Sequence, residues 1–385
     1  HCISSAASDV YKRQASFIAK TIDELHDEHG VRPGDVAVFY RTNAQSRAIE
    51  EVFVRVGLPY KVVGGTRFYE RREVKDALAY LRVVANPADT VNLRRIINVP
   101  KRGIGDRAQL AVAQLAERER IPFVAALGRA EDAPGIATRS LKAVQGFTAL
   151  LESLREQRDS GAGVGELLEA VLERTGYTAE LQASRDPQDE TRLENLAELV
   201  GVAREFDATR EATGEVISLD DFLEQVSLVA DADEIPDDPG EGGEAADQGV
   251  VTLMTLHTAK GLEFPVVFLT GMEDGTFPHQ RSLGNATELE EERRLAYVGI
   301  TRARERLHLS RAAVRSAFGA PQSNPASRFL DEIPEHLVRW ERTGPPVGLG
   351  RGSGREPAVA RLAARPGVRS PGNRPGISLL SLIHI

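Results

Sequence analysis

The chain has 385 residues, and 41% of them are hydrophobic, which is enough to fill the cores of two ordinary domains. Its formal net charge of −9 argues against a protein that attracts nucleic acid over its whole surface, so such binding would need local basic patches. The single cysteine, Cys2, excludes a disulfide framework, and the lack of a long apolar run or a secretory pattern leads us to expect a cytoplasmic protein without membrane segments.

Both ends of the chain read as sequencing adapter. The DNA encoding Asp9 to Gln14 and the DNA encoding Leu380 to Ile385 can be reverse complements, as adapter read through at both ends of a fragment would be. We therefore expect residues 1–14 and 380–385 to be adapter-derived and leave them out of the fold prediction. The alternative is a genuine N-terminal strand and an apolar C-terminal tail.

From residue 15 to residue 91, helices and strands are predicted to alternate. The apolar run Val36 to Tyr40 is typical of a buried strand, and a second strand is predicted at residues 60–63. Between them, Asn43 is predicted to cap a helix that Gly57 ends. An amphipathic helix follows the second strand. This alternation implies a parallel sheet.

Residues 92–232 are rich in Leu, Ala, Glu and Arg at helical spacing, which predicts an all-helical insertion. Residues 233–249 combine acidic side chains with Pro and Gly and are predicted to be a linker. The strand pattern resumes in residues 250–343, so we expect a sheet that begins before the insertion to be completed after it. Residues 344–379, rich in Arg, Pro and Gly, are predicted to be a disordered tail.

Four motifs carry a family resemblance. YRTNAQSR, GGTRFYERREVKD, TLHTAKGLEFP and EEERRLAYVGITRA begin at Tyr40, Gly64, Thr255 and Glu290, and in this order they resemble superfamily I DNA helicases of the UvrD/PcrA type. The resemblance covers about Ala15 to Leu337. It implies an α/β fold, the RecA-like second motor domain, in which a parallel sheet with helices on both faces is interrupted by a large all-helical insertion.

No G-x-x-x-x-G-K-[ST] phosphate loop occurs in the sequence. The resemblance therefore implies that the first motor domain is absent, together with the phosphate loop, the Mg²⁺ ligands and the water-positioning glutamine that it would carry. ATP with Mg²⁺ is the expected cofactor of the whole protein. No His or Cys cluster has zinc spacing, and we predict no metal site in this chain.

Five residues are predicted to face ATP. Arg41 follows a hydrophobic strand, at the carboxyl edge where open α/β sheets bind ligands, and Arg302 lies near another element boundary. The resemblance implies that both arginines reach the γ-phosphate as arginine fingers. It also implies that Tyr40 stacks on the adenine and Glu263 binds the ribose, while Lys260 is placed to neutralise a phosphate. The alternatives are surface or helix-end arginines and a core tyrosine.

Two basic stretches, at residues 67–75 and 94–107, and one histidine are predicted to contact DNA. The resemblance places His257 near single-stranded DNA, although an ordinary loop histidine remains the alternative. In the turn PKRGIGD, glycines let backbone amides approach a phosphate beside basic side chains, unless the turn is only a connector between helices. The predicted DNA contacts are His257, Arg67, Phe68, Lys101, Arg102, Gly103 and Gly105.

These motifs predict part of an ATP-dependent DNA helicase or translocase that acts in DNA repair or replication, with 3′-to-5′ polarity implied by the resemblance alone. The chain by itself is predicted to be inactive. Expected partners are single-stranded DNA, single/double-strand junctions, and repair or transcription proteins that bind the insertion or the tail. The alternative is a non-catalytic DNA- or protein-binding adaptor derived from a helicase. The helicase half of a recombination nuclease is disfavoured, because no nuclease-like Asp and Glu-x-Lys pattern follows the last motif.

Overall fold

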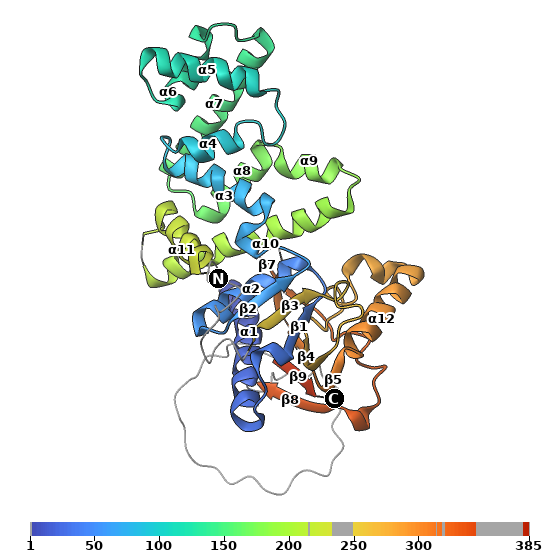
Figure 1. Cartoon of the computed structure of the whole chain (residues 1–385). Helices are drawn as coiled ribbons and strands as arrows, with labels where there is room; N and C mark the ends of the chain where they lie inside the picture. Colours follow the sequence, from blue (N-terminus) through green and yellow to red (C-terminus); the bar gives the residue numbers. More distant parts are fainter. Residues whose placement is uncertain are drawn as a thin grey trace, which may run out of the picture.

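The computed structural model describes residues 2–214, 216–232, 249–312, 314–317, 320–343 and 380–384. Its main sheet has seven strands in the order β2-β3-β1-β4-β5-β9-β8 (Figure 1). The first five are mutually parallel: β2 (Tyr60–Val63), β3 (Val251–Thr255), β1 (Val36–Tyr40), β4 (Phe264–Leu269) and β5 (Ala303–Ala312). Next to them lie antiparallel β9 (Leu380–His384) and β8 (Arg339–Thr343), and β6 (Val314–Ala317) pairs with β7 (Ala320–Ser323).

Several predicted segments fall at the limits of the described ranges. Residues 233–248 of the predicted linker and the predicted tail at residues 344–379 lie outside them. The two segments attributed to adapter are partly described, the first within helix α1 (Cys2–His29) and the second as strand β9. Their adapter origin stays a prediction.

Strand β1 lies at the centre of the parallel sheet, and all five of its residues are buried. Val36, Val38 and Tyr40 pack in a core shared with α1 and α2 (Ser46–Val56). Ala37 and Phe39 point to the opposite core, which α12 (Ala286–Ile300) covers. Side chains alternate between the two faces of a strand, and both faces here are covered by helices, so the strand reads as a continuous apolar run. The predicted α/β sheet with helices on both faces is confirmed.

The turn after β1 differs from the prediction. Asn43 does not cap a long helix but begins the short 3₁₀ turn η2 (Asn43–Gln45), and α2 starts at Ser46. The cause is Gln45, whose side-chain Oε1 accepts hydrogen bonds from the backbone N–H groups of Arg41 and Thr42, each at 2.9 Å. The end of α2 is as predicted, because Gly57 adopts a left-handed conformation with φ of 72°.

A helical part lies above the sheet in Figure 1 and has its own hydrophobic core. It comprises α3 (Arg72–Ala85), α4 (Thr90–Ile96), α5 (Asp106–Glu119), α6 (Phe123–Gly128), α7 (Thr138–Asp159), α8 (Val164–Arg174), α9 (Tyr177–Ala183), α10 (Pro187–Thr213) and α11 (Leu219–Ala232). Because Val74, Leu78 and Leu81 of α3 belong to this core, the change from sheet to helices falls between β2 and Phe68 and not at residue 92. The amphipathic spacing of α3 shows which of its faces is buried, but not which layer covers that face.

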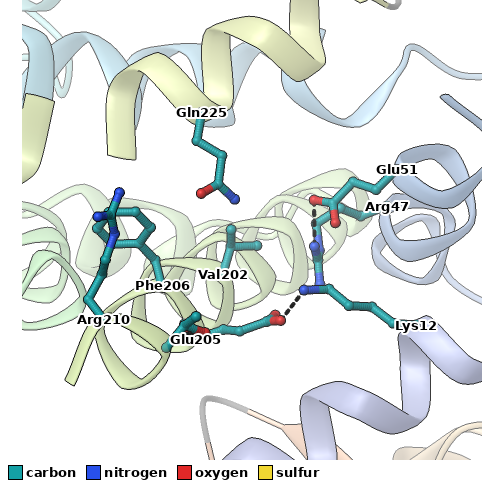
Figure 2. Close-up of a pocket in the computed structure, with 9 residues that line it drawn as sticks. Lys12, Arg47, Glu51, Val202, Glu205, Phe206, Arg210 and Gln225 are labelled. Carbon is teal, nitrogen blue, oxygen red and sulfur yellow. Dashed lines mark hydrogen bonds and ion pairs between the residues drawn. The ribbon is translucent and has the colours of Figure 1, made fainter. Parts of the chain in front are cut away.

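Charged side chains join the helical part to the sheet part between α2 and α10. Arg47 of α2 forms ion pairs of 2.6 Å with Glu51 of the same helix and with Glu198 of α10. Tyr69, in the 3₁₀ turn η3 (Phe68–Glu70), donates a hydrogen bond of 2.9 Å to Glu51. Figure 2 shows Arg47 and Glu51 beside a pocket of about 160 Å³ that α1, α2, α10 and α11 line, with Lys12 paired to Glu205 at its edge. We call the Arg47, Glu51, Glu198 and Tyr69 cluster the seam.

Candidate functional site

A pocket of about 460 Å³ opens at the carboxyl ends of β1 and β3. Its walls come from the residues after these two strands, from the segment with the 3₁₀ turn η5 (Gln280–Gly284), and from α10 and α12. Its basic side chains are Arg41, His257, His279 and Arg281. This is the edge at which open parallel sheets bind ligands.

Arg41 is held on both its backbone and its side chain. Gln45 fixes the backbone, as described above. The guanidinium makes a forked ion pair with Glu292 of α12, with Nε to Oε1 at 2.9 Å, Nε to Oε2 at 3.0 Å and Nη2 to Oε1 at 2.6 Å. Glu292 lies in the EEERRLAYVGITRA motif, but the sequence alone indicates no role for it. The two residues are 251 positions apart in the sequence, so no local sequence pattern could predict that they pair.

His257 lies in the same pocket as Arg41, on the segment that follows β3. Its pKa is lowered from the ordinary 6.5, first because surrounding atoms partly desolvate the ring and second because Arg41 is positively charged. Glu292 and Glu291 oppose this shift. The neutral form of the ring is therefore favoured at pH 7. A negative group that enters the pocket would raise this pKa and favour the protonated form.

The remaining basic groups of the pocket are paired with α10. His279 Nε2 lies 3.3 Å from Glu194 Oε1, and Arg281 pairs with Glu190. The backbone N–H of His279 also donates to Glu292 at 3.0 Å. The pocket thus brings together cationic and anionic side chains from the sheet part and the helical part.

Glu263 and Arg302 lie elsewhere, at the amino ends of β4 and β5. Arg302 donates to the carbonyl oxygens of Val298 at 3.0 Å and Leu262 at 3.2 Å, and to Thr301 Oγ1 at 3.0 Å. Glu263 is half-exposed and pairs with Arg304 at 3.1 Å. Arg302 therefore also ties the C-terminal end of α12 to the segment before β4, as a cation at a helix end does.

The strand register places Arg41 and Arg302 at opposite ends of the parallel strands, Arg41 at the carboxyl end of β1 and Arg302 at the amino end of β5. Arg302 directly precedes the Ala303 and Phe264 pair, and the Val36 and Val266 pair follows further along the sheet. Arg41 follows the last residue of β1. At 3.3 Å per residue, the two arginines are separated by roughly 25 Å along the strands. The expectation that both reach one γ-phosphate does not fit this geometry, which groups Arg41 with His257.

Two aromatic residues, one predicted to stack on adenine and the other to contact DNA, are core residues. Tyr40 is 0% exposed and packs among the side chains between the sheet, α1 and α2, and burial raises the pKa of its hydroxyl. Phe68 is likewise 0% exposed, meets the Tyr69 ring edge-on, and lies under the guanidinium of Arg71. Neither ring face is open to an adenine or a base. The alternative of a core tyrosine was the better one.

In the PKRGIGD turn, only some of the residues predicted to contact DNA are exposed. Arg102 is occupied by the helical part: its Nη1 donates to Ile96 O at 2.8 Å, and its Nη2 donates to Tyr80 OH at 2.7 Å. Lys101, Gly103 and Gly105 are exposed. Gly103 has φ of 87°, a conformation that favours glycine, and Gly105 precedes α5.

The other predicted residues lie apart from one another. Lys260 is exposed on the segment between β3 and β4, three residues after His257 in the chain. Arg67 is half-buried, with its guanidinium over the ring of Tyr60. Within the described ranges, no group of three or more His, Cys, Asp or Glu side chains is arranged to hold a metal ion. None of the helices in those ranges combines the length and apolar character needed to cross a bilayer.

Comparison with known proteins agrees with the motifs and the fold. A family profile described as the UvrD-like helicase C-terminal domain matches residues 5–313. The chain is 56% identical to the ATP-dependent DNA helicase UvrD1 of Mycobacterium tuberculosis over 370 residues, which are 91% of this chain and 47% of the relative. It is 44% identical to the ATP-dependent DNA helicase PcrA of Bacillus subtilis over 325 residues, which are 84% of this chain and 43% of that protein. The chain thus spans less than half the length of these relatives, and it belongs to the family of the UvrD-like helicase C-terminal domain.

Proposed function

We propose that this chain is the second motor domain of an ATP-dependent DNA helicase or translocase. In this proposal it works with a domain that supplies the phosphate loop and the Mg²⁺ ligands. Single-stranded DNA and its junctions with duplex are the substrates, repair or replication is the setting, and 3′-to-5′ polarity follows from the family resemblance. The observation that carries the proposal is the division of the family motifs between two opposite edges of one rigid sheet.

The edge with Glu263 and Arg302 is the proposed nucleotide edge. A half-exposed carboxylate suits a ribose hydroxyl, and a guanidinium can stabilise the charge that spreads over the γ-phosphate oxygens during hydrolysis. Arg302 now donates to two backbone carbonyls and a hydroxyl, which are neutral acceptors. A phosphate is a stronger acceptor for a charged donor, so ATP can draw the guanidinium away from them.

The edge with Arg41 and His257 is the proposed DNA edge. Both side chains line one open pocket at the carboxyl ends of β1 and β3, and a DNA phosphate would be attracted to the cations there. Lys101 and the glycine turn lie in the helical part and are proposed to meet the duplex side of a junction. When the cleft between this domain and the first motor domain closes around ATP, the DNA edge would move together with the nucleotide edge.

A hybrid protein tests this function. The chain replaces its matched counterpart in the M. tuberculosis UvrD1 helicase, and ATP hydrolysis is measured with and without single-stranded DNA. We expect no hydrolysis by the chain alone and DNA-stimulated hydrolysis by the hybrid. Arg302→Ala should lower the hydrolysis rate by about 10³-fold with little change in DNA affinity. Arg118→Ala, at an exposed position on α5, is the matched control and should leave hydrolysis unchanged.

Two results would contradict the proposal. Turnover by the purified chain alone would mean that it carries a complete ATP site. A folded hybrid that binds DNA but does not hydrolyse ATP would instead favour the adaptor alternative.

A further inference from the structure

The ion pair between Arg41 and Glu292 is built more firmly than a surface contact. The Arg41 side chain is 20% exposed and that of Glu292 only 6%. Both carboxylate oxygens of Glu292 are engaged, one of them also by the backbone N–H of His279. Forked pairs of this kind fix the plane of the guanidinium as well as its position.

The fork occupies one side of the guanidinium. Glu292 takes Nε and Nη2, and no hydrogen bond from Nη1 is found within the described residues. Arg41 therefore keeps donors for one further acceptor while its orientation is fixed by the carboxylate. Gln45 fixes the backbone of the same residue, so the direction of these donors is set at both ends.

We propose that Glu292 is a positioning residue that aligns Arg41 for contact with a DNA phosphate. This inference rests on the proposed function of the DNA edge and adds a residue to it. Glu292 contacts no DNA itself. Glu292 lies on α12, the helix that leads to Arg302. Through Glu292, Arg41 of the DNA edge is therefore fixed to the helix that extends to the nucleotide edge.

Glu292 could instead act through its negative charge alone, by neutralising Arg41 without orienting it. Two substitutions separate position from charge. Glu292→Asp keeps the charge but shortens the side chain by one methylene, so the fork cannot form at its present length. Glu292→Gln removes the charge and keeps the length of the side chain, but it leaves only one of the two acceptor oxygens that form the fork.

The experiment measures binding of a fluorescent oligothymidylate to the chain by anisotropy at several salt concentrations. Arg41→Ala should weaken binding about tenfold and lower the salt dependence of log K by about 0.7, the value for one phosphate contact on a single strand. Glu292→Asp should weaken binding about fivefold and Glu292→Gln should not tighten it, whereas neutralisation alone predicts unchanged binding for the first variant and tighter binding for the second. The control is Glu290→Asp, an exposed carboxylate of α12 that does not line the pocket and pairs with Arg293.

A double variant guards against a general loss of folding. If Glu292 acts through Arg41, then adding Glu292→Asp to Arg41→Ala should cause no further loss of affinity. A further loss in that background would show that Glu292 acts by another route and would overturn the inference. So would unchanged affinity of the Glu292→Asp variant. No binding by the parent, or equal binding by Arg41→Ala, would contradict the DNA edge itself, and the inference with it.

Discussion

At the scale of single residues, His257 is a group of the DNA edge whose charge can change near neutral pH. Its pKa lies below 6.5 in the absence of DNA, because of partial desolvation and the nearby Arg41. A phosphate in the pocket favours the protonated ring, so binding should raise this pKa and take up a proton. Binding linked to proton uptake tightens as the pH falls, until the ring is already protonated in the free protein.

We therefore expect the affinity for single-stranded DNA to rise as the pH is lowered from 7.5, and to level off below the lowered pKa of His257. Anisotropy titrations at constant ionic strength measure this dependence. His257→Gln should remove most of it, while His29→Gln, an exposed histidine at the end of α1, should leave it intact. An unchanged pH profile in the His257→Gln variant would show that another group is responsible.

Residue types at motif positions could be predicted from the sequence, but their surroundings could not. The sequence placed Arg41 at a sheet edge correctly, because a polar residue after an apolar strand has few other places to lie. It could not show that Tyr40, one residue earlier, points into the core between the sheet, α1 and α2. The pairing of Arg41 with Glu292 and the occupation of Arg102 by Ile96 and Tyr80 also depend on contacts between distant segments.

At the scale of elements, α12 connects the two edges. Glu292 lies in its first half and contacts the DNA edge, and Arg302 follows its C-terminal end at the nucleotide edge. The helix packs close to the sheet at Gly299. A Cβ added there would lie 2.5 Å from Leu256 Cδ2 and 3.4 Å from Leu269 Cδ2. Leu256 and Leu269 are fully buried, so they cannot move aside freely.

Gly299→Ala should therefore destabilise the protein, although alanine favours a helix over glycine by about 1 kcal/mol. Overpacking of this kind costs roughly 1–3 kcal/mol and would outweigh the gain in propensity. Gly146→Ala is the matched control, since this exposed glycine of α7 has nothing within 4 Å of an added Cβ and should give a more stable protein. The free energy of unfolding, measured in urea, checks both. Stabilisation by both substitutions would mean that α12 is not closely packed at Gly299.

Strands β1 and β2 and the end of α2 were predictable because each leaves a pattern in its own residues. Strand β1 matches its predicted residues, 36–40, and α2 ends at the predicted glycine. The start of α2 was missed because Gln45 uses its side chain to hold the preceding turn, a contact that the capping pattern at Asn43 does not reveal. The layer to which α3 belongs was missed because its apolar face carries no information on its partner.

At the scale of the whole molecule, the seam sets how the helical part sits on the sheet part. Arg47 is almost completely buried there, at 6% exposure of its side chain, between Glu51 at 13% and Glu198 at 17%. A second set of contacts lies next to it, where Arg71 donates to Asn195 of α10 at 2.8 Å and Asn195 donates to Glu73 at 2.6 Å. Glu190 and Glu194, which reach the DNA edge, lie on the same helix as Asn195 and Glu198. The position of α10 at the DNA edge therefore depends on the seam.

Removal of the central cation tests this dependence. Arg47→Met leaves two largely buried carboxylates without their shared partner, and such a change typically costs about 3–5 kcal/mol. Replacement of all three groups, as Arg47→Met with Glu51→Gln and Glu198→Leu, should restore most of that loss because no unpaired charge remains. Arg32→Ala, which breaks an exposed pair with Asp35, should cost only about 0–1 kcal/mol. Urea unfolding followed by circular dichroism measures each variant. If Arg47→Met were as stable as Arg32→Ala, the ion pairs of the seam would not be what holds α10 against α2, and the buried contacts of Arg71 and Asn195 would have to do so.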